Sequence, residues 1–142
     1  RVLFRSSVIF ISSLAAFRGL PSLSVYSSAK MALTSIAETL RIEHRHDGIH
    51  IGIVYVGYTE VEKGKTTINA DGTPVELGER KSRLSETIDN VAKKIAGNIS
   101  SRKKRTVIGV PGKFYAFLVR YFPATLEMMV HRSYRKMKDL YK

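Results

Sequence analysis

The sequence predicts an α/β protein built on a doubly wound parallel sheet. Two observations lead to this fold class: short runs of β-branched and aromatic residues without polar alternation, and longer segments whose apolar residues recur at helical spacing between those runs. A buried strand, a crossover helix and a second buried strand form a parallel, right-handed unit. We therefore interpret residues 1–142 as one partial domain, without an internal repeat or a second domain.

The first crossover unit lies in the N-terminal part of the chain. The run SVIFIS, residues 7–12, predicts a strand covered on both faces. Residues 24–46 predict a long helix with Ser24 as its N-cap and Asp47-Gly48 as its stop. The run IHIGIVYVG, residues 49–57, then predicts a second buried strand.

The remaining elements follow a long polar segment. Residues 58–84 contain Asp71-Gly72 between two strand-like arms, which predicts a small hairpin. A loop of this length in a compact domain usually has a function, and we expect it to cover the substrate site. Residues 85–101 predict an amphipathic helix and residues 106–110 a third strand, whereas residues 111–142 predict a basic amphipathic segment of two helices separated at Pro123.

Three parallel strands with their helices do not make a finished sheet. One edge stays open and its apolar faces stay uncovered. The chain also begins with Arg1 rather than with Met. We therefore expect the C-terminal half of a doubly wound domain, with the N-terminal half absent.

The positive charge is concentrated at the C-terminal end. The formal net charge is +12, and residues 102–142 carry +9, since they hold eleven Lys and Arg against Glu127 and Asp139. The purely structural interpretation is a solvated helix that packs on the sheet or on a second subunit. Interleaved aromatic residues favour a membrane-surface segment as the next interpretation, and scattered basic residues predict no nucleic-acid partner.

Cysteine and histidine usage excludes some kinds of site. The chain has no cysteine, so it has neither a disulfide framework nor a thiolate metal site, and a reducing, cytoplasmic location is permitted. The four histidines lie at element ends or in polar contexts and predict no metal site. No apolar run reaches the length of a membrane span, because Lys113 and Arg120 interrupt the best candidate.

Polar residues follow both strands of the first crossover unit. Ligands of doubly wound sheets bind beyond the carboxyl ends of the strands. The first predicted strand ends near Ser13 and the second ends near Gly57, so both clusters belong to the same edge of the sheet. The connecting helix carries Tyr26 and Lys30, which are four residues apart and therefore share one helix face.

The spacing of Tyr26 and Lys30 is weak on its own. Tyr134 and Lys138 repeat it in the basic segment without an upstream serine at a strand end. Each predicted site residue also has a purely structural interpretation: a capping serine, a half-buried helix tyrosine and a surface lysine. Their joint position on a strand end, a loop and a crossover helix favours catalysis over these separate interpretations.

The run VIFISSLAAFRGLPSLSVYSSAKMALTSIAETLRIE resembles the catalytic segment of the classical short-chain dehydrogenase/reductases, which have a Rossmann-type fold. The following VGYTE resembles the nicotinamide-side loop of that family. The resemblance is strong over residues 6–62 and weaker to about residue 110.

The resemblance implies a role for each residue of the cluster. Tyr26 would be the general acid or base, and Lys30 would favour its phenolate and hold the ribose of a bound NAD or NADP. Ser13 would bind the oxygen of a carbonyl or alcohol substrate. Tyr26, Gly57 and Thr59 would also contact the cofactor, and Tyr58 would bind the substrate.

The sequence also departs from the family pattern. Many members have Pro-Gly where this chain has Val56-Gly57, and Thr where Val61 stands, which weakens the cofactor-loop assignment more than the catalytic one. No Gly-rich turn for the pyrophosphate follows a strand in these 142 residues. We therefore expect the chain by itself to bind a dinucleotide poorly and to be inactive.

The predicted function is reversible hydride transfer between NAD or NADP and a carbonyl or secondary alcohol, with lipophilic compounds among the candidate substrates. The resemblance further implies a homo-oligomer for the full-length protein. Two alternatives remain open: a Rossmann-type binding protein that has lost turnover, and a module that contacts membranes peripherally through its basic segment.

Overall fold

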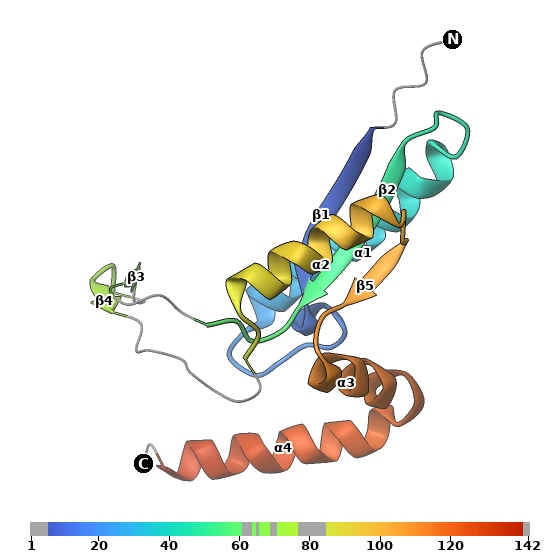
Figure 1. The fold of residues 1–142 in the computed structure, drawn as a ribbon. Coiled ribbons are helices and arrows are strands. Elements are labelled where there is room, and N and C mark those ends of the chain that lie inside the picture. The colour runs from blue at the N-terminus through green and yellow to red at the C-terminus, as the bar shows by residue number, and fades with distance from the viewer. Residues whose placement is uncertain (1–5, 61–63, 65, 69–70, 77–84, 141–142) are drawn as a thin grey trace.

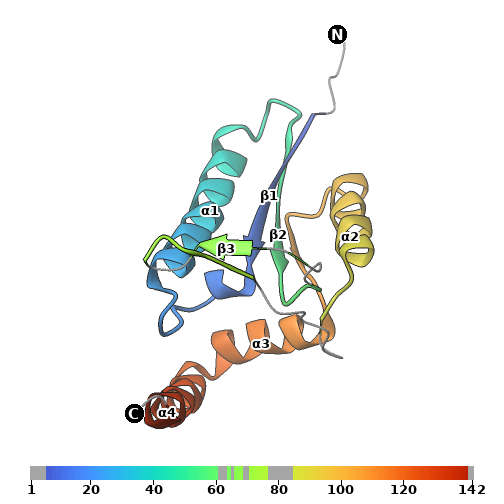
Figure 2. The same ribbon diagram turned by 90° about the vertical axis from the view of Figure 1, so that its left-hand side faces the viewer.

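A computed structural model of the chain describes residues 6–60, 64, 66–68, 71–76 and 85–140. Its main sheet contains β1 (Ser7–Ser13), β2 (His50–Val56) and β5 (Arg105–Val107), all parallel and in the order β1-β2-β5. Helix α1 (Ser24–Glu43) covers one face of the sheet and α2 (Ile88–Ser100) covers the other (Figures 1 and 2). The predicted α/β class with a parallel sheet is therefore confirmed.

The central strand β2 forms the core of the domain. Ile53, Val54 and Tyr55 are each 0% exposed, which agrees with the unbroken apolar run expected for a parallel strand covered on both faces. Ala37 of α1 packs into the same cluster, and the ring of Phe17 stacks on that of Tyr55 at a centroid distance of 4.5 Å. The core thus joins α1, β2 and the loop after β1.

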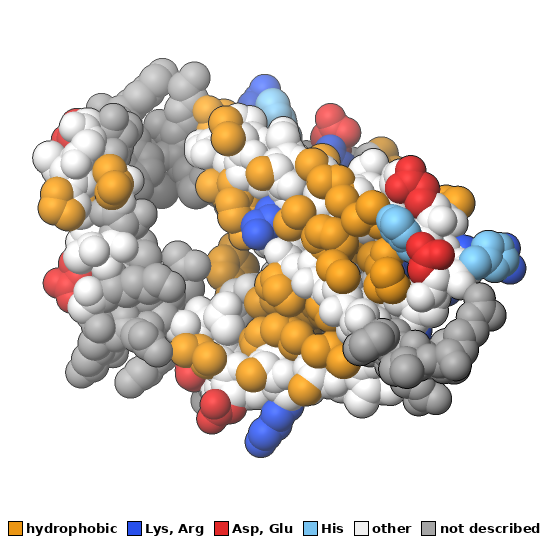
Figure 3. Space-filling view, turned by 90° about the horizontal axis from the view of Figure 1, so that it is seen from above, with side chains coloured by type: hydrophobic (Ala, Val, Ile, Leu, Met, Phe, Trp, Pro, Cys, Tyr) orange, Lys and Arg blue, Asp and Glu red, His pale blue; other side chains and the backbone are white. Residues whose placement is uncertain are grey.

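Strand β1 differs from the prediction that it is covered on both faces. It is an edge strand, and its side chains Val8 and Ile11 are 45% and 42% exposed. On α1, the apolar side chain of Val25 is 84% exposed. The space-filling view from above shows hydrophobic side chains gathered in a broad band across the middle of the molecule (Figure 3). These exposed positions fit the predicted open edge of an incomplete sheet.

Several predicted boundaries shift because of local backbone chemistry. The N-cap of α1 is Leu23 rather than Ser24, which is the first helical residue, and α1 ends at Glu43. Helix α2 begins at Ile88 because the Thr87 hydroxyl accepts a hydrogen bond from the Asn90 backbone N–H at 3.2 Å.

The third strand is shorter than predicted. Strand β5 ends at Val107 because Gly109, with φ of 80°, turns the chain and Pro111 follows in the first turn of the next helix. Residues 108–110 therefore form a turn and a helix start rather than a strand.

Two helices follow this turn. Helices α3 (Val110–Tyr121) and α4 (Pro123–Leu140) are separated at Phe122, as the position of Pro123 predicts. Both lie beyond the carboxyl ends of the strands (Figure 1). The predicted hairpin around Asp71-Gly72 is also present, with β3 (Thr66–Ile68) antiparallel to β4 (Pro74–Glu76).

A buried polar cluster fixes α2 to the sheet. The Asn98 side-chain amide donates to the Thr106 hydroxyl at 2.8 Å, and its oxygen lies 3.4 Å from Nε2 of His50. Asn98 is 1% exposed and His50 is 6% exposed. Gly52 leaves room for this amide, since a Cβ there would lie 2.5 Å from its oxygen. His50 thus begins a strand, as predicted, but it is buried and hydrogen-bonded.

Candidate active site

The carboxyl ends of the three strands meet at one edge of the sheet. Ser13 pairs with Val56 in the β1–β2 register. On the other side of β2, the Ile108 backbone N–H donates to the Tyr55 carbonyl at 3.0 Å. The two polar clusters that follow β1 and β2 in the sequence therefore lie together, as parallel pairing predicts.

Tyr26 and Lys30 lie on one face of α1 near this edge. Tyr26 is in the first turn of the helix and is 45% exposed, so solutes can reach its phenol. The Lys30 Nζ lies 5.8 Å from the centre of the Tyr26 ring. It also donates to the Ile11 carbonyl at 3.2 Å. The ammonium group is thus held between the end of β1 and the phenol.

A neighbouring serine, Ser12, holds α1 to β1 at the same place. Ser12 is 3% exposed, and its hydroxyl donates to the Lys30 backbone carbonyl at 3.0 Å. Lys30 therefore contacts β1 through both its side chain and its backbone. Sequence reasoning assigned no role to Ser12, because only the packing of α1 on β1 shows what its hydroxyl contacts.

Ser13 is half-buried and caps a short helix. It is the N-cap of the 3-10 helix η1 (Leu14–Ala16), where its hydroxyl oxygen accepts from the Ala15 backbone N–H at 3.2 Å. This contact is the capping role that the purely structural interpretation assigned to Ser13. The hydroxyl proton is not used in that bond and stays available as a donor.

Gly57 packs closely on η1. A Cβ at Gly57 would lie 3.1 Å from Cδ1 of Leu14, and one at Gly112 of α3 would lie 3.2 Å from its Cδ2. Leu14 is thus enclosed by two glycines at the edge of the sheet. The lack of a side chain at Gly57 allows this close packing against Leu14. A role of Gly57 in the approach of a cofactor would be additional to this packing.

The segment after β2 is anchored to the start of α2. Thr59 forms a bridge with Glu86, and the Glu86 backbone N–H donates to the Tyr58 carbonyl at 2.9 Å. The Glu86 carboxylate also lies 3.4 Å from Nζ of Lys94. Tyr58 itself is 66% exposed. Val61 and most of the predicted covering segment, residues 58–84, lie outside the described residues.

The second Tyr-Lys pair with the same spacing, Tyr134 and Lys138, lies on a different helix and far along the sequence from Tyr26. Tyr134 is on α4 and is 39% exposed. The side chain of Lys138 lies outside the described part of the chain. The Tyr134 position therefore serves as a matched control for Tyr26.

A second tyrosine near the strand ends has a perturbed environment. Burial raises the pKa of the Tyr115 phenol, and the positive charge of Arg18 opposes that shift. Its hydroxyl is buried and has no hydrogen-bond partner among the described residues. The desolvated phenol is therefore held in its neutral form.

The arrangement has the parts of a proton-transfer site. An accessible phenol lies beside a fixed ammonium, and a serine hydroxyl ends the adjacent strand. Such a set can exchange a proton with a substrate oxygen and stabilise the charge that develops. The fold and the site together define an α/β protein with a candidate proton-transfer site at the carboxyl ends of its strands.

Comparison with known proteins shows which family the chain is similar to. Residues 4–72 match the family model described as short chain dehydrogenase. An uncharacterized oxidoreductase of Myxococcus xanthus is 36% identical over 58 residues, which is 41% of this chain. The 11-beta-hydroxysteroid dehydrogenase 1A of Arabidopsis thaliana is 38% identical over 80 residues, which is 50% of this chain. These matches, each over part of the chain, support its membership of the short-chain dehydrogenase family.

A solved structure has the same fold. The short chain dehydrogenase of Burkholderia cenocepacia, determined in complex with NADP, superposes with a TM-score of 0.66 and 15% identity over 87% of this chain. The chain covers 46% of that protein and 23% of each of the two relatives. Among the described residues, none of the helices is both long and apolar enough to cross a membrane.

Proposed function

We propose that the protein is an NAD- or NADP-dependent oxidoreductase that interconverts a carbonyl compound and a secondary alcohol. The observation that carries this proposal is the position of Lys30, whose ammonium is bonded to the Ile11 carbonyl beside the accessible Tyr26 phenol. The match to the family model and the NADP complex of the Burkholderia protein support a nicotinamide cofactor.

The residues present suit the nicotinamide-ribose end of such a cofactor. Lys30 uses one N–H on the Ile11 carbonyl and keeps two for ribose hydroxyls. Gly57 and Thr59 lie at the adjacent strand end and would line the same region. When bound, the cofactor supplies or accepts the hydride.

In the reducing direction, the carbonyl carbon receives the hydride that the bound cofactor would supply. Tyr26 gives its phenolic proton to the carbonyl oxygen, so the C=O double bond becomes a C–O single bond with one new C–H bond from the hydride and one new O–H bond. Ser13 donates a hydrogen bond to that oxygen and orients it, and Tyr58 borders the substrate. In the oxidising direction the Tyr26 phenolate takes the alcohol proton, and the Lys30 charge stabilises that phenolate.

The test compares Tyr26→Phe with Tyr134→Phe in the longest native form of the protein. Nicotinamide absorbance is followed with a panel of ketones and secondary alcohols, including lipophilic ones. Loss of a general acid should lower the rate by about 10²- to 10⁴-fold in Tyr26→Phe. The Tyr134→Phe control should keep the parent rate.

Equal rates for the parent and Tyr26→Phe would refute the catalytic assignment. The alternative of a binding protein without turnover is favoured by the Val56-Gly57 departure. It would give a nicotinamide-binding signal in all three proteins with no absorbance change in any of them.

A further inference from the structure

The outward face of α3 is unusual for a surface helix. Val110, Phe114, Phe117 and Tyr121 recur at intervals of three and four residues and are 79%, 62%, 48% and 60% exposed. We call these four residues the aromatic stripe. A helix of a globular protein normally turns polar residues outward. The stripe therefore exposes apolar area that the described part of the chain leaves uncovered.

The inward face of α3 already supplies the packing that the domain needs. Gly112 is buried against Leu14 and Val107. Ala116 and Val119 line a shallow hollow of about 210 Å³ together with Phe17, Arg105, Val107 and Arg120. Because both faces of α3 are apolar, the outward one is available to an external partner.

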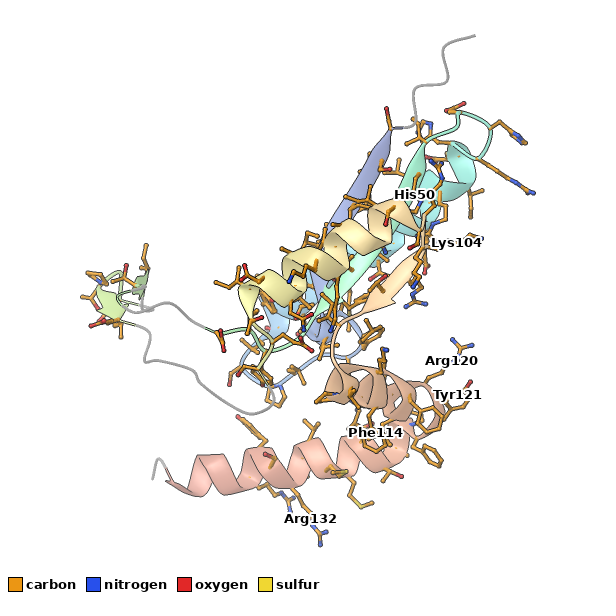
Figure 4. The ribbon with its side chains drawn as sticks, in the orientation of Figure 1. His50, Lys104, Phe114, Arg120, Tyr121 and Arg132 are labelled. Carbon is orange, nitrogen blue, oxygen red and sulfur yellow. The ribbon has the colours of Figure 1, made fainter. Side chains whose placement is uncertain are left out.

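Positive charges border the aromatic stripe. Lys113 and Arg120 are exposed and follow one side of it at helical spacing, and the Arg120 guanidinium lies 5.9 Å from the Tyr121 ring centre. Phe114 and Tyr121 extend from α3 on sides that do not face the sheet, and Arg132 extends from α4 away from α3 (Figure 4). Charge and apolar area are thus presented by the same end of the molecule.

Acidic residues are scarce in this region. The sequence from residue 102 to residue 126 contains no Asp or Glu. The first acidic side chain beyond it, Glu127, forms an ion pair with Arg18 at 2.9 Å. A second copy of the chain would bring the same cations together, whereas an anionic surface would neutralise them.

We propose that the aromatic stripe and its bordering cations dock on the surface of a membrane that contains anionic lipids. Phe and Tyr side chains enter the headgroup boundary, and Lys113 and Arg120 contact lipid phosphates. Helix α3 has 12 residues and a length of about 18 Å, so it lies on the bilayer rather than across it. This surface adjoins the carboxyl ends of the strands, where Tyr26 is located. The inference does not depend on hydride transfer.

A single tryptophan can report the contact directly, because the chain has none. Phe117→Trp places the probe in the stripe, and Ile42→Trp places it on α1 at a side chain that is 77% exposed. We expect vesicles of phosphatidylcholine with phosphatidylserine to shift the emission of Phe117→Trp to shorter wavelength. The emission of Ile42→Trp should not change, and phosphatidylcholine alone should produce little shift in either protein.

Co-sedimentation with the same vesicles measures the energetic terms. Each cation near an anionic surface contributes about 1 kcal/mol, so Lys113→Gln with Arg120→Gln should weaken partitioning about thirtyfold. Phe114→Ser with Phe117→Ser should weaken it by at least about tenfold. The matched control, Val25→Ser with Ile42→Ser, removes exposed apolar side chains from α1 and should bind as the parent does. Circular dichroism of each variant verifies that it is folded.

Three outcomes would overturn the proposal. The first is an unchanged Phe117→Trp emission with anionic vesicles, and the second is equal binding to vesicles with and without phosphatidylserine. The third is a blue shift that appears without lipid and grows with protein concentration, which would assign the stripe to a second copy of the chain.

Discussion

Replacement of Asn98 by leucine removes the polar connection between α2 and the sheet while keeping a side chain of similar size. Asn98 donates to Thr106 at 2.8 Å and lies 3.4 Å from the His50 ring nitrogen. The variant loses both bonds and leaves His50 Nε2 and the Thr106 hydroxyl without a partner. A buried polar group left unpaired costs about 1–3 kcal/mol, and less if water reaches it.

The expected cost is therefore about 2–4 kcal/mol, because His50 is 6% exposed whereas Thr106 is only half-buried and can regain water. This is a large part of the roughly 5–15 kcal/mol that stabilises a typical domain. Equilibrium urea unfolding measures the loss of free energy. Lys93→Leu, at an exposed position on the same helix, should stay within about 0.5 kcal/mol of the parent.

A double-mutant cycle separates the hydrogen bond from general packing. Thr106→Val removes the acceptor of the Asn98 amide, so the double variant should be less destabilised than the two single effects added together, by about 1 kcal/mol. An Asn98→Leu protein that unfolds within about 0.5 kcal/mol of the parent would refute the reasoning. Strict additivity in the cycle would also refute it.

Two further substitutions test the strand ends. Ser12→Ala removes the hydrogen bond to the Lys30 carbonyl and should lower the unfolding free energy by about 0.5–1.5 kcal/mol in urea, whereas Ser35→Ala on the exposed side of α1 should have no measurable effect. Tyr115→Phe removes a buried hydroxyl without a described partner and should leave stability at pH 7 equal or higher. Since burial raises the pKa of Tyr115 above its ordinary value of 10.0, the folded parent holds this proton more strongly than the unfolded chain does. The stability of the parent should fall as the pH rises beyond about 10, and part of that fall should be missing in Tyr115→Phe. An unfolding temperature that falls equally with pH in the two proteins would contradict this assignment.

Local patterns in the residues were sufficient for the order of the elements. The apolar run of β2 predicted a strand covered on both faces, and all of its residues except Val56 are buried. The spacing of Tyr26 and Lys30 predicted a shared helix face, and the ammonium does lie near the ring. These predictions succeed because the period of a helix or strand depends only on neighbouring residues.

Other features depend on parts of the chain that are distant in the sequence. The similar apolar run of β1 gave the wrong expectation, because burial of a strand depends on what covers it and β1 lies at the edge of the described sheet. The two adjacent serines also differ only through packing. Ser12 bonds to α1, whereas Ser13 caps η1, since successive strand residues point in opposite directions.

The residues alone thus specify the α/β class, the crossover unit and the juxtaposition of Tyr26 with Lys30. Tertiary structure decided that Lys30 is tied to β1 at Ile11 and Ser12, and that Asn98 meets His50 across 48 positions of sequence. It also decided that the aromatic stripe of α3 faces outward. Periodicity states which side chains share a face, but only the packing of distant segments determines what that face meets.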